Sequence, residues 1–145
     1  MPNSLNCPFD CAGPAIDTWE CPGEFAIRFL ATKLSRSDRE FSEPDVWRDY
    51  GWEIACPTPD CEVSIVVLEP PTKGDWALKI AAKRRPFLLG QLLGRKASAD
   101  AQQIHSLATD IHDALTADSR FANLRWAWDD IPDGSLPPGP PPIAG

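Results

Sequence analysis

Three consecutive segments with alternating side chains constrain the fold of this 145-residue chain more than any other feature. Residues 51–56, 61–69 and 75–83 are rich in β-branched, aromatic and small apolar residues, and short stretches with proline, aspartate or glycine separate them. Such runs joined by turn residues are typical of an antiparallel meander with one apolar and one polar face. A sheet of this kind needs a second layer to cover its apolar face.

The covering layer is predicted to be a helix over residues 98–117. Ser98 is a preferred helix-capping residue, and the apolar residues that follow it recur at the spacing of one helical face. They are Ala101, Ile104, Leu107, Ala108, Ile111 and Leu115. The preceding segment, 86–97, has two glycines among its leucines, and its pattern indicates neither a helix nor an ordinary loop.

Three weaker patterns complete the predicted fold. Alternating apolar residues favour a first strand over 24–32 and a last strand over 124–128. Ser42 can cap a short helix over 43–50. The predicted class is therefore α+β: a two-layer sandwich of an antiparallel sheet with four to five strands, the long helix and this short one. The predicted core comprises Phe25, Ile27, Val63, Ile65, Val67, Trp76, Leu78, Ile104, Leu107, Ile111 and Leu115.

The composition divides the chain into three parts. Residues 1–23 carry several prolines and glycines without the period of a strand or a helix, so we expect an irregular cysteine-bearing arm. Residues 24–131 are predicted to form a single α+β domain, which is long enough to bury a core. Residues 132–145 are so rich in proline and glycine that we expect a disordered tail. Pro137 and Pro140 match a PxxP ligand spacing, but no basic residue flanks them, which favours a spacer.

Charge and hydropathy limit the classes of function. The chain has 14 basic and 21 acidic residues, and this net charge of −7 argues against broad nucleic-acid binding, because phosphate contacts need clustered Lys and Arg. No apolar run approaches the roughly 18 residues of a membrane-spanning helix. Residues 1–20 lack the basic and apolar regions of a secretion signal. We therefore expect a cytoplasmic protein without a membrane span, whose cysteines are reduced.

Two cysteine pairs have spacings that zinc ligands use. Cys7 with Cys11, and Cys56 with Cys61, could place four thiolates around one tetrahedral ion. The second pair could instead form a disulfide across a hairpin, which leaves Cys21 as one of the unpaired thiols. Small buried cysteines are also ordinary core residues. We predict reduced thiols and no cofactor, with a structural zinc site as the alternative.

The two histidines give little support to catalysis. His105 and His112 stand seven residues apart on the predicted helix, about 10 Å along its axis, which is too far to chelate one ion. We expect both to pack at the boundary of the core. The chain contains no nucleophile elbow, phosphate-binding loop, dinucleotide-binding glycine motif or HExxH motif. An enzyme that uses a thiol or a thiolate-bound zinc is kept as an alternative.

Basic charge gathers in one segment of this acidic chain. Between residues 73 and 96 there are seven Lys or Arg residues and one acidic residue, Asp75. A basic rim around apolar residues can bind a partner protein, whereas lysines along a strand edge can also simply protect it from aggregation. Nucleic-acid binding through residues 79–96 is a further alternative. The predicted partner-binding residues are Lys83, Arg84, Arg85, Phe87, Arg95 and Lys96.

Two stretches in the last half of the chain carry a family resemblance. They are RRPFLLGQLLGRKASADAQQIHSLATDIHDAL (residues 84–115) and RFANLRWAWDDIPDG (residues 120–134), and a proline-rich end follows them. This pattern resembles a family of small uncharacterised bacterial proteins, which implies a bacterial origin but carries over no activity and no site residue.

Small size, acidity and the basic segment together favour a noncatalytic protein-binding module, of the immunity or adaptor kind, with an unidentified protein partner.

Overall fold

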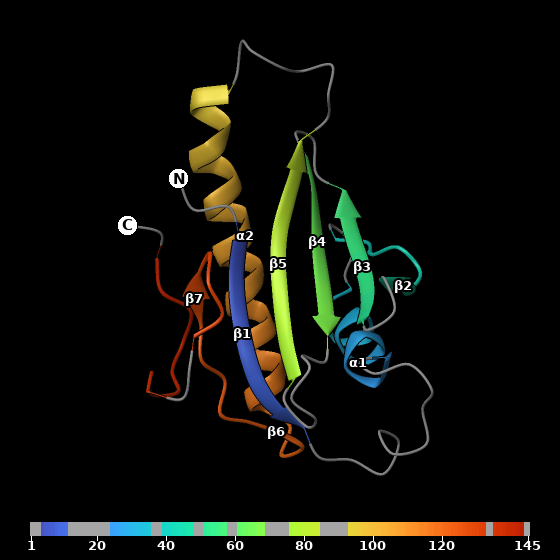
Figure 1. Ribbon diagram of the computed structural model, residues 1–145. Coiled ribbons are helices and arrows are strands. Elements are labelled where there is room, and N and C mark those ends of the chain that lie inside the picture. Colours follow the sequence, from blue (N-terminus) through green and yellow to red (C-terminus); the bar gives the residue numbers. More distant parts are fainter. Residues whose placement is uncertain are drawn as a thin grey trace.

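The computed structural model describes residues 4–11, 24–35, 39–47, 51–57, 61–68, 76–84, 93–132 and 135–143. Within these segments the chain forms an antiparallel sheet of seven strands with two helices, which confirms the predicted α+β class (Figure 1). The strand order is β2-β3-β4-β5-β1, and both β6 and β7 pair with the outer edge of β1. The elements are β1 (Ser4–Cys11), α1 (Glu24–Leu34), β2 (Asp45–Trp47), β3 (Gly51–Pro57), β4 (Cys61–Leu68), β5 (Trp76–Arg84), α2 (Leu93–Thr116), β6 (Phe121–Ala122) and β7 (Ala127–Trp128).

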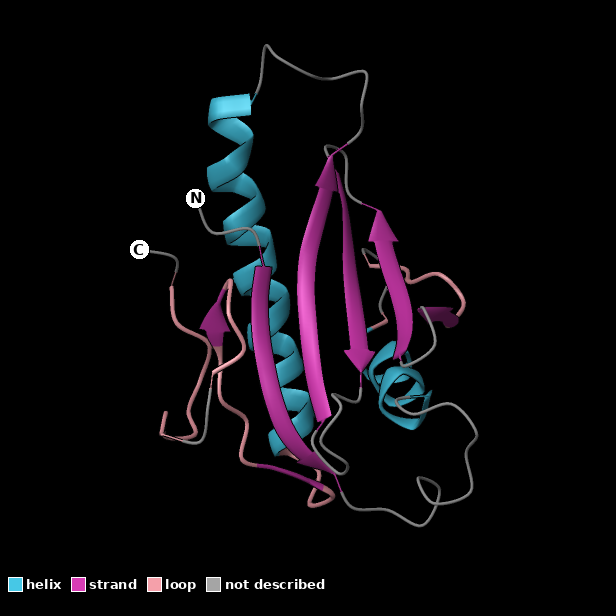
Figure 2. Ribbon diagram, viewed as in Figure 1, coloured by secondary structure: helices cyan, strands magenta, loops and turns pink. Residues whose placement is uncertain are grey.

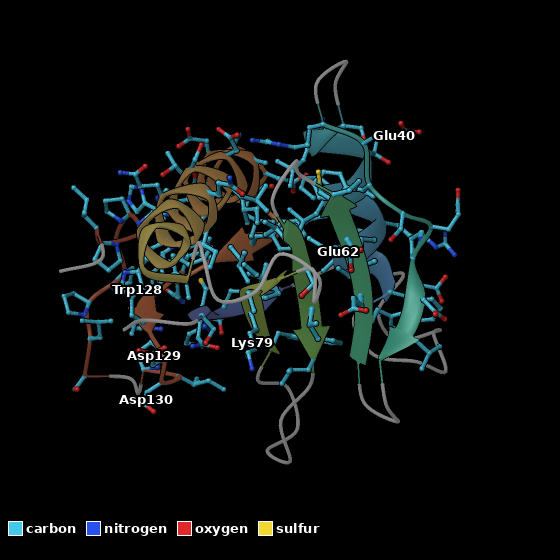
Figure 3. All side chains as sticks on the ribbon, turned by 90° about the horizontal axis from the view of Figure 1, so that it is seen from above. Glu40, Glu62, Lys79, Trp128, Asp129 and Asp130 are labelled. Carbon is cyan, nitrogen blue, oxygen red and sulfur yellow. The ribbon has the colours of Figure 1, made fainter. Side chains whose placement is uncertain are left out.

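The predicted meander is confirmed as β3, β4 and β5. Its register places Ile54, Ile65 and Ile80 in one row, and all three side chains are fully buried. Glu62 and Lys79 fall on the alternate positions and are exposed. Figure 3 shows Lys79 on the side of the sheet away from α2. The meander therefore has one apolar face and one face with charged residues, as the alternation predicted.

The two helices cover the apolar face of the sheet. α2 contacts β1 and β5, α1 contacts β3 and β4, and the helices also contact each other (Figure 1). The predicted long helix is confirmed, and it begins at Leu93, five residues before its predicted start. All predicted core residues are buried except Phe25, which is partly buried at the edge of the core. Large residues that were not predicted also join the core: Leu5, Cys7, Phe9, Leu30, Leu34, Ile54, Ile80, Phe121, Leu124 and Trp126.

Neither described helix combines the length and the apolar character that a membrane span needs.

The prediction of a strand over residues 24–32 is wrong, because these residues belong to α1. The buried residues of α1 are Ala26, Ile27, Leu30 and Leu34, and their spacing of three and four residues is that of a helical face. Six of the nine residues 24–32 are apolar, so the segment also satisfies an alternation by two. So many apolar residues in a short segment do not distinguish a strand from a helix.

The predicted short helix over residues 43–50 is wrong at 45–47, which form β2 at one end of the described sheet. Ser42 caps no helix. Its Oγ accepts a hydrogen bond from the backbone N–H of Ala55 (3.0 Å), and its own N–H donates to the carbonyl of Ala55 (2.8 Å). Ser42 therefore ties the start of this strand to β3. Residues 48–50 lie outside the described part of the chain.

The expected irregular arm is wrong for residues 4–11, which form β1 between β5 and the short strands β6 and β7 (Figure 1). The side chains of Leu5, Cys7 and Phe9 point into the core and are 0%, 0% and 3% exposed. These residues alternate with polar residues and Pro8, so the period of a strand is present but short. The rest of the expected arm lies outside the described residues.

Pro8 divides the outer edge of β1 into two short pairings. Backbone groups of alternate residues point to the same edge of a strand. On the outer edge the carbonyl of Ser4 accepts from the N–H of Asp129 (2.7 Å), and the carbonyl of Pro8 accepts from the N–H of Arg125 (3.3 Å). Pro8 therefore faces this edge but has no N–H to donate, which interrupts the ladder. The partner strand is split into β6 and β7, and the predicted last strand is confirmed only in β7.

Candidate binding surface

The segment between β6 and the C-terminal tail is tied to β1 at both of its ends. Asn123 and Asp129 have φ angles of 58° and 65°, in the left-handed region that Asn and Asp tolerate better than most residues. Nδ2 of Asn123 donates to Oδ2 of Asp10 (2.6 Å). Oδ1 of Asp129 accepts from the N–H of Ser4 (3.3 Å). The residues between Asn123 and Asp129 therefore run in a fixed direction along the sheet edge.

The expectation of a disordered tail is wrong for residues 135–143, which run beside β7 at the edge of the sheet (Figure 2). Pro141 is buried there. The composition suggested disorder because prolines have no N–H with which to join a sheet. Each proline nevertheless keeps a carbonyl acceptor, and extended proline-rich chains form no internal hydrogen bonds to these carbonyls. Such a segment binds where the rest of the protein supplies donors.

Two ring nitrogens donate to adjacent carbonyls near the end of the tail. Nε1–H of Trp128, in β7, donates to the carbonyl of Pro142 (3.0 Å). Nε2 of His105, on α2, lies 3.1 Å from the carbonyl oxygen of Pro141. The histidine nitrogen is the donor in this pair, because a carbonyl oxygen only accepts. In Figure 3, Trp128 lies at the outer edge of the molecule, on the side where the tail runs. A strand and a helix thus contribute one donor each.

Two further hydrogen bonds hold the earlier part of the tail. Nε of Arg125 donates to the carbonyl of Leu136 (2.6 Å), and the N–H of Gly139 donates to the carbonyl of Leu124 (3.1 Å). Within residues 137–142 Gly139 alone has an N–H, because the other five residues are prolines. The one N–H of residues 137–142 is therefore placed against an acceptor. The tail-binding surface is defined as His105, Leu124, Arg125 and Trp128.

The second histidine of α2 has a different partner. Nε1 of Trp126 donates to Nδ1 of His112 (3.2 Å), and the two rings meet edge-on with their centroids 6.5 Å apart. Trp126 is 3% exposed, whereas Trp128 is only partly buried. The two tryptophans therefore have separate roles: Trp126 joins the sheet edge to α2, and Trp128 reaches the tail. Both histidines are partly buried, as expected for the boundary of the core.

The strand order separates the cysteines of the suggested zinc site. Cys7 lies in β1 and Cys56 in β3, with β4 and β5 between them. Three strand intervals span about 14 Å, whereas each sulfur of a zinc site lies about 2.3 Å from the ion. The two pairs therefore do not form one four-thiolate site. Cys56 lies opposite Val63 in the hairpin and not opposite Cys61, which also argues against a disulfide between them.

Burial makes the thiol of Cys7 unreactive. The loss of hydration raises its pKa from 9.0 to about 12, although the backbone N–H and the charge of Arg125 act in the opposite direction. A nucleophilic cysteine needs a lowered pKa, so Cys7 does not fit a thiol enzyme. In the described part of the chain, no group of three or more His, Cys, Asp or Glu side chains is placed to hold a metal ion.

The structure describes only part of the predicted basic binding segment. Lys83 and Arg84 are the last two residues of β5, and Arg95 and Lys96 lie in the first turn of α2. The end of β5 and the start of α2 lie at the same end of the molecule (Figure 1). Binding through this segment stays a prediction. Outside the described residues lie Arg85 and Phe87.

Comparison with known proteins gives no match: no family model, no curated protein and no solved structure matches this chain. The predicted partner-binding residues include neither Trp128 nor any residue of the tail, whose composition favours a spacer. The two parts of this contact can be read in the sequence as a tryptophan-rich segment and a proline run. The missing information was the pairing of β7 with β1, which sets where the tryptophan lies.

Proposed function

We propose that this protein is a noncatalytic protein-binding module, of the immunity or adaptor kind, and that it binds its partner through the tail-binding surface. The observation that carries this proposal is the convergence of three donors. Trp128, His105 and Arg125 come from a strand, a helix and a connecting segment, and each donates to a carbonyl of one extended segment. Peptide-recognition domains bind extended ligands by this combination of backbone hydrogen bonds and aromatic side chains.

The use of the potentially reactive side chains supports a noncatalytic role. The thiol of Cys7 is buried with a raised pKa. Nδ1 of His112 accepts from Trp126, and Nε2 of His105 donates to the tail. The lone pair of Nδ1 of His112 and the Nε2–H of His105 are therefore used in structural contacts, and burial disfavours the thiolate of Cys7. The cytoplasmic location and the bacterial origin expected from the sequence belong to the same proposal.

The test is the capture and identification of partners from native cells with the full-length protein and matched variants. Trp128→Phe keeps the aromatic ring and removes the indole N–H. Trp52→Phe is the control, because the indole N–H of Trp52 is buried and has no acceptor in the described part of the structure. The partner identified by wild type is then purified, and its affinity for each variant is measured. We expect Trp128→Phe to bind it more weakly, by at most about fivefold, since a hydrogen bond contributes about 1 kcal/mol and the same N–H also binds the chain's own tail. Trp52→Phe should bind it as wild type does.

Two outcomes would contradict the proposal. In the first, a partner binds the Trp128→Phe variant as it binds wild type but does not bind the Lys83→Glu variant. This result would place the binding site in the basic segment. Recovery of nucleic acid in place of protein, with an affinity that falls steeply with salt, would replace the protein-binding module by the nucleic-acid alternative.

A further inference from the structure

We infer that the ligand of the tail-binding surface is an extended proline-rich segment of a partner protein, and that the chain's own tail is a displaceable occupant of the same surface. The inference rests on the proposed function, because it names the ligand class and the regulation of the same site. Three observations carry it: the atoms of the tail that are bound, the position of the one N–H within residues 137–142, and the way in which the tail is attached.

The surface binds the backbone of the tail. Its three side-chain donors contact the carbonyl oxygens of Leu136, Pro141 and Pro142. A polyproline II helix presents its carbonyls to the outside without internal hydrogen bonds. The fixed φ of proline also lowers the conformational entropy lost on binding. A proline-rich segment of another protein with the same carbonyl spacing would therefore satisfy the same donors.

The position of Gly139 adds a requirement for one residue other than proline. Its N–H donates to the carbonyl of Leu124 (3.1 Å). A Cβ added at Gly139 would meet no atom within 4 Å, so there is space for a side chain at this position. The site therefore requires the N–H and not the glycine itself. The expected ligand pattern is two prolines, one residue other than proline, and three prolines.

The tail is attached in a way that allows it to leave. Residues 135–143 add no strand to the described sheet, while β6 and β7 are held by backbone pairing to β1. The bond between Trp126 and His112 holds the neighbouring part of the sheet edge to α2 without the tail. Release of the tail would therefore expose the donors without disrupting the core.

The covalent connection of the tail favours its own binding over that of a free ligand. A short tether gives an effective concentration of about 1 mM. If the tail and a free peptide of the same sequence share an intrinsic Kd of about 100 μM, the peptide binds wild type about tenfold more weakly than it binds a chain whose tail is released. A partner replaces the tail when it is abundant or when a second contact holds it nearby. The tail thus sets a threshold for partner binding.

The test uses the full-length chain and a labelled peptide with the sequence of residues 135–143, SLPPGPPPI, acetylated and amidated at its ends. Gly139→Pro removes the N–H that binds Leu124 and so releases the tail, whereas Gly139→Ala keeps this N–H and is the matched control. Peptide affinity is measured by fluorescence anisotropy. We expect Gly139→Pro to bind the peptide about tenfold more tightly than either wild type or Gly139→Ala does. The reason is that a released tail no longer competes with the peptide for the surface.

A second pair of variants locates the bound peptide. In the Gly139→Pro background, Trp128→Phe should weaken peptide binding about fivefold, and Trp52→Phe should leave it unchanged. A peptide in which alanine replaces every proline should bind at least about tenfold more weakly, because it loses the preformed extended conformation.

The outcomes separate this inference from the proposed function. Equal peptide affinity of wild type and Gly139→Pro contradicts the role of the tail as an occupant. No peptide binding by Gly139→Pro contradicts a proline-rich ligand. If either result is found while a purified cellular partner still depends on Trp128, the inference fails and the proposed function stands. If the peptide binds as expected but no cellular partner depends on Trp128, the ligand chemistry stands and the proposed function fails.

Discussion

The two ends of the chain join the fold in different ways. Residues 4–11 form an interior strand that pairs along both edges and buries three core side chains. The contacts that hold residues 135–143 include the four hydrogen bonds described above and one buried proline. A strand that is paired on both sides cannot leave without opening the sheet. A segment bound mainly through its carbonyls covers the sheet edge and can be exchanged for another of the same chemistry.

The largest effect is expected at the N-terminal strand. Leu5 is fully buried opposite Ile80 of β5, and Leu5→Ala would leave a cavity in the centre of the core. We expect the free energy of unfolding, measured by urea denaturation, to fall by about 2–5 kcal/mol. The control is Ile143→Ala at the other end of the chain, where the side chain is 81% exposed. This change should alter stability by less than about 0.5 kcal/mol. Similar effects at the two positions would contradict the contrast between the ends.

Removal of the tail should have a smaller effect. A chain that ends at Pro132 loses the four hydrogen bonds to the tail, each worth about 1 kcal/mol in net terms. The shortened chain also no longer incurs the entropy cost of ordering the tail, which offsets part of this loss. We expect the free energy of unfolding to fall by about 1–2 kcal/mol, with the same core packing. A fall as large as that of Leu5→Ala would show that the tail is part of the core.

A third prediction uses the pKa of Cys7 in β1. Burial raises this pKa from 9.0 to about 12, so the unfolded chain loses the thiol proton first as the pH rises. The stabilisation from the buried neutral thiol is complete below about pH 9 and is lost between about pH 9 and pH 12. From about pH 7 to about pH 10, wild type should lose about 1 kcal/mol more stability than Cys7→Ala. If urea denaturation shows the same loss of stability for wild type and Cys7→Ala, the pKa of the thiol is not raised in the folded protein.

The part of the fold that sequence predicted correctly depends on local patterns. The meander has a clear period and recognisable turns, and α2 has a clear period although Ser98, its predicted cap, lies inside the helix. The segment of α1 is different, because Phe25, Ile27 and Phe29 alternate by two while Ala26 and Leu30 repeat by four. Only the sheet that the segment covers decides between the two periods.

The remaining errors concern pairings between distant parts of the chain. β1 is short and contains a proline, and its partners β5, β6 and β7 lie far along the sequence. The binding surface depends on the same pairings, because β1 positions Arg125 and Trp128 through the outer edge of the sheet. Composition alone described the tail correctly as proline-rich. It could not show that three donors would converge on the tail.

Native-state hydrogen exchange tests the contrast between the two ends most directly. The amides of Cys7 and Phe9 face β5, since they alternate with the residues that face the outer edge. We predict that these amides exchange only with global unfolding, at the full free energy of about 5–15 kcal/mol. The amide of Gly139 and the indole N–H of Trp128 should exchange through a local opening that costs about 1–3 kcal/mol. Exchange of all four groups at one common free energy would contradict a displaceable tail.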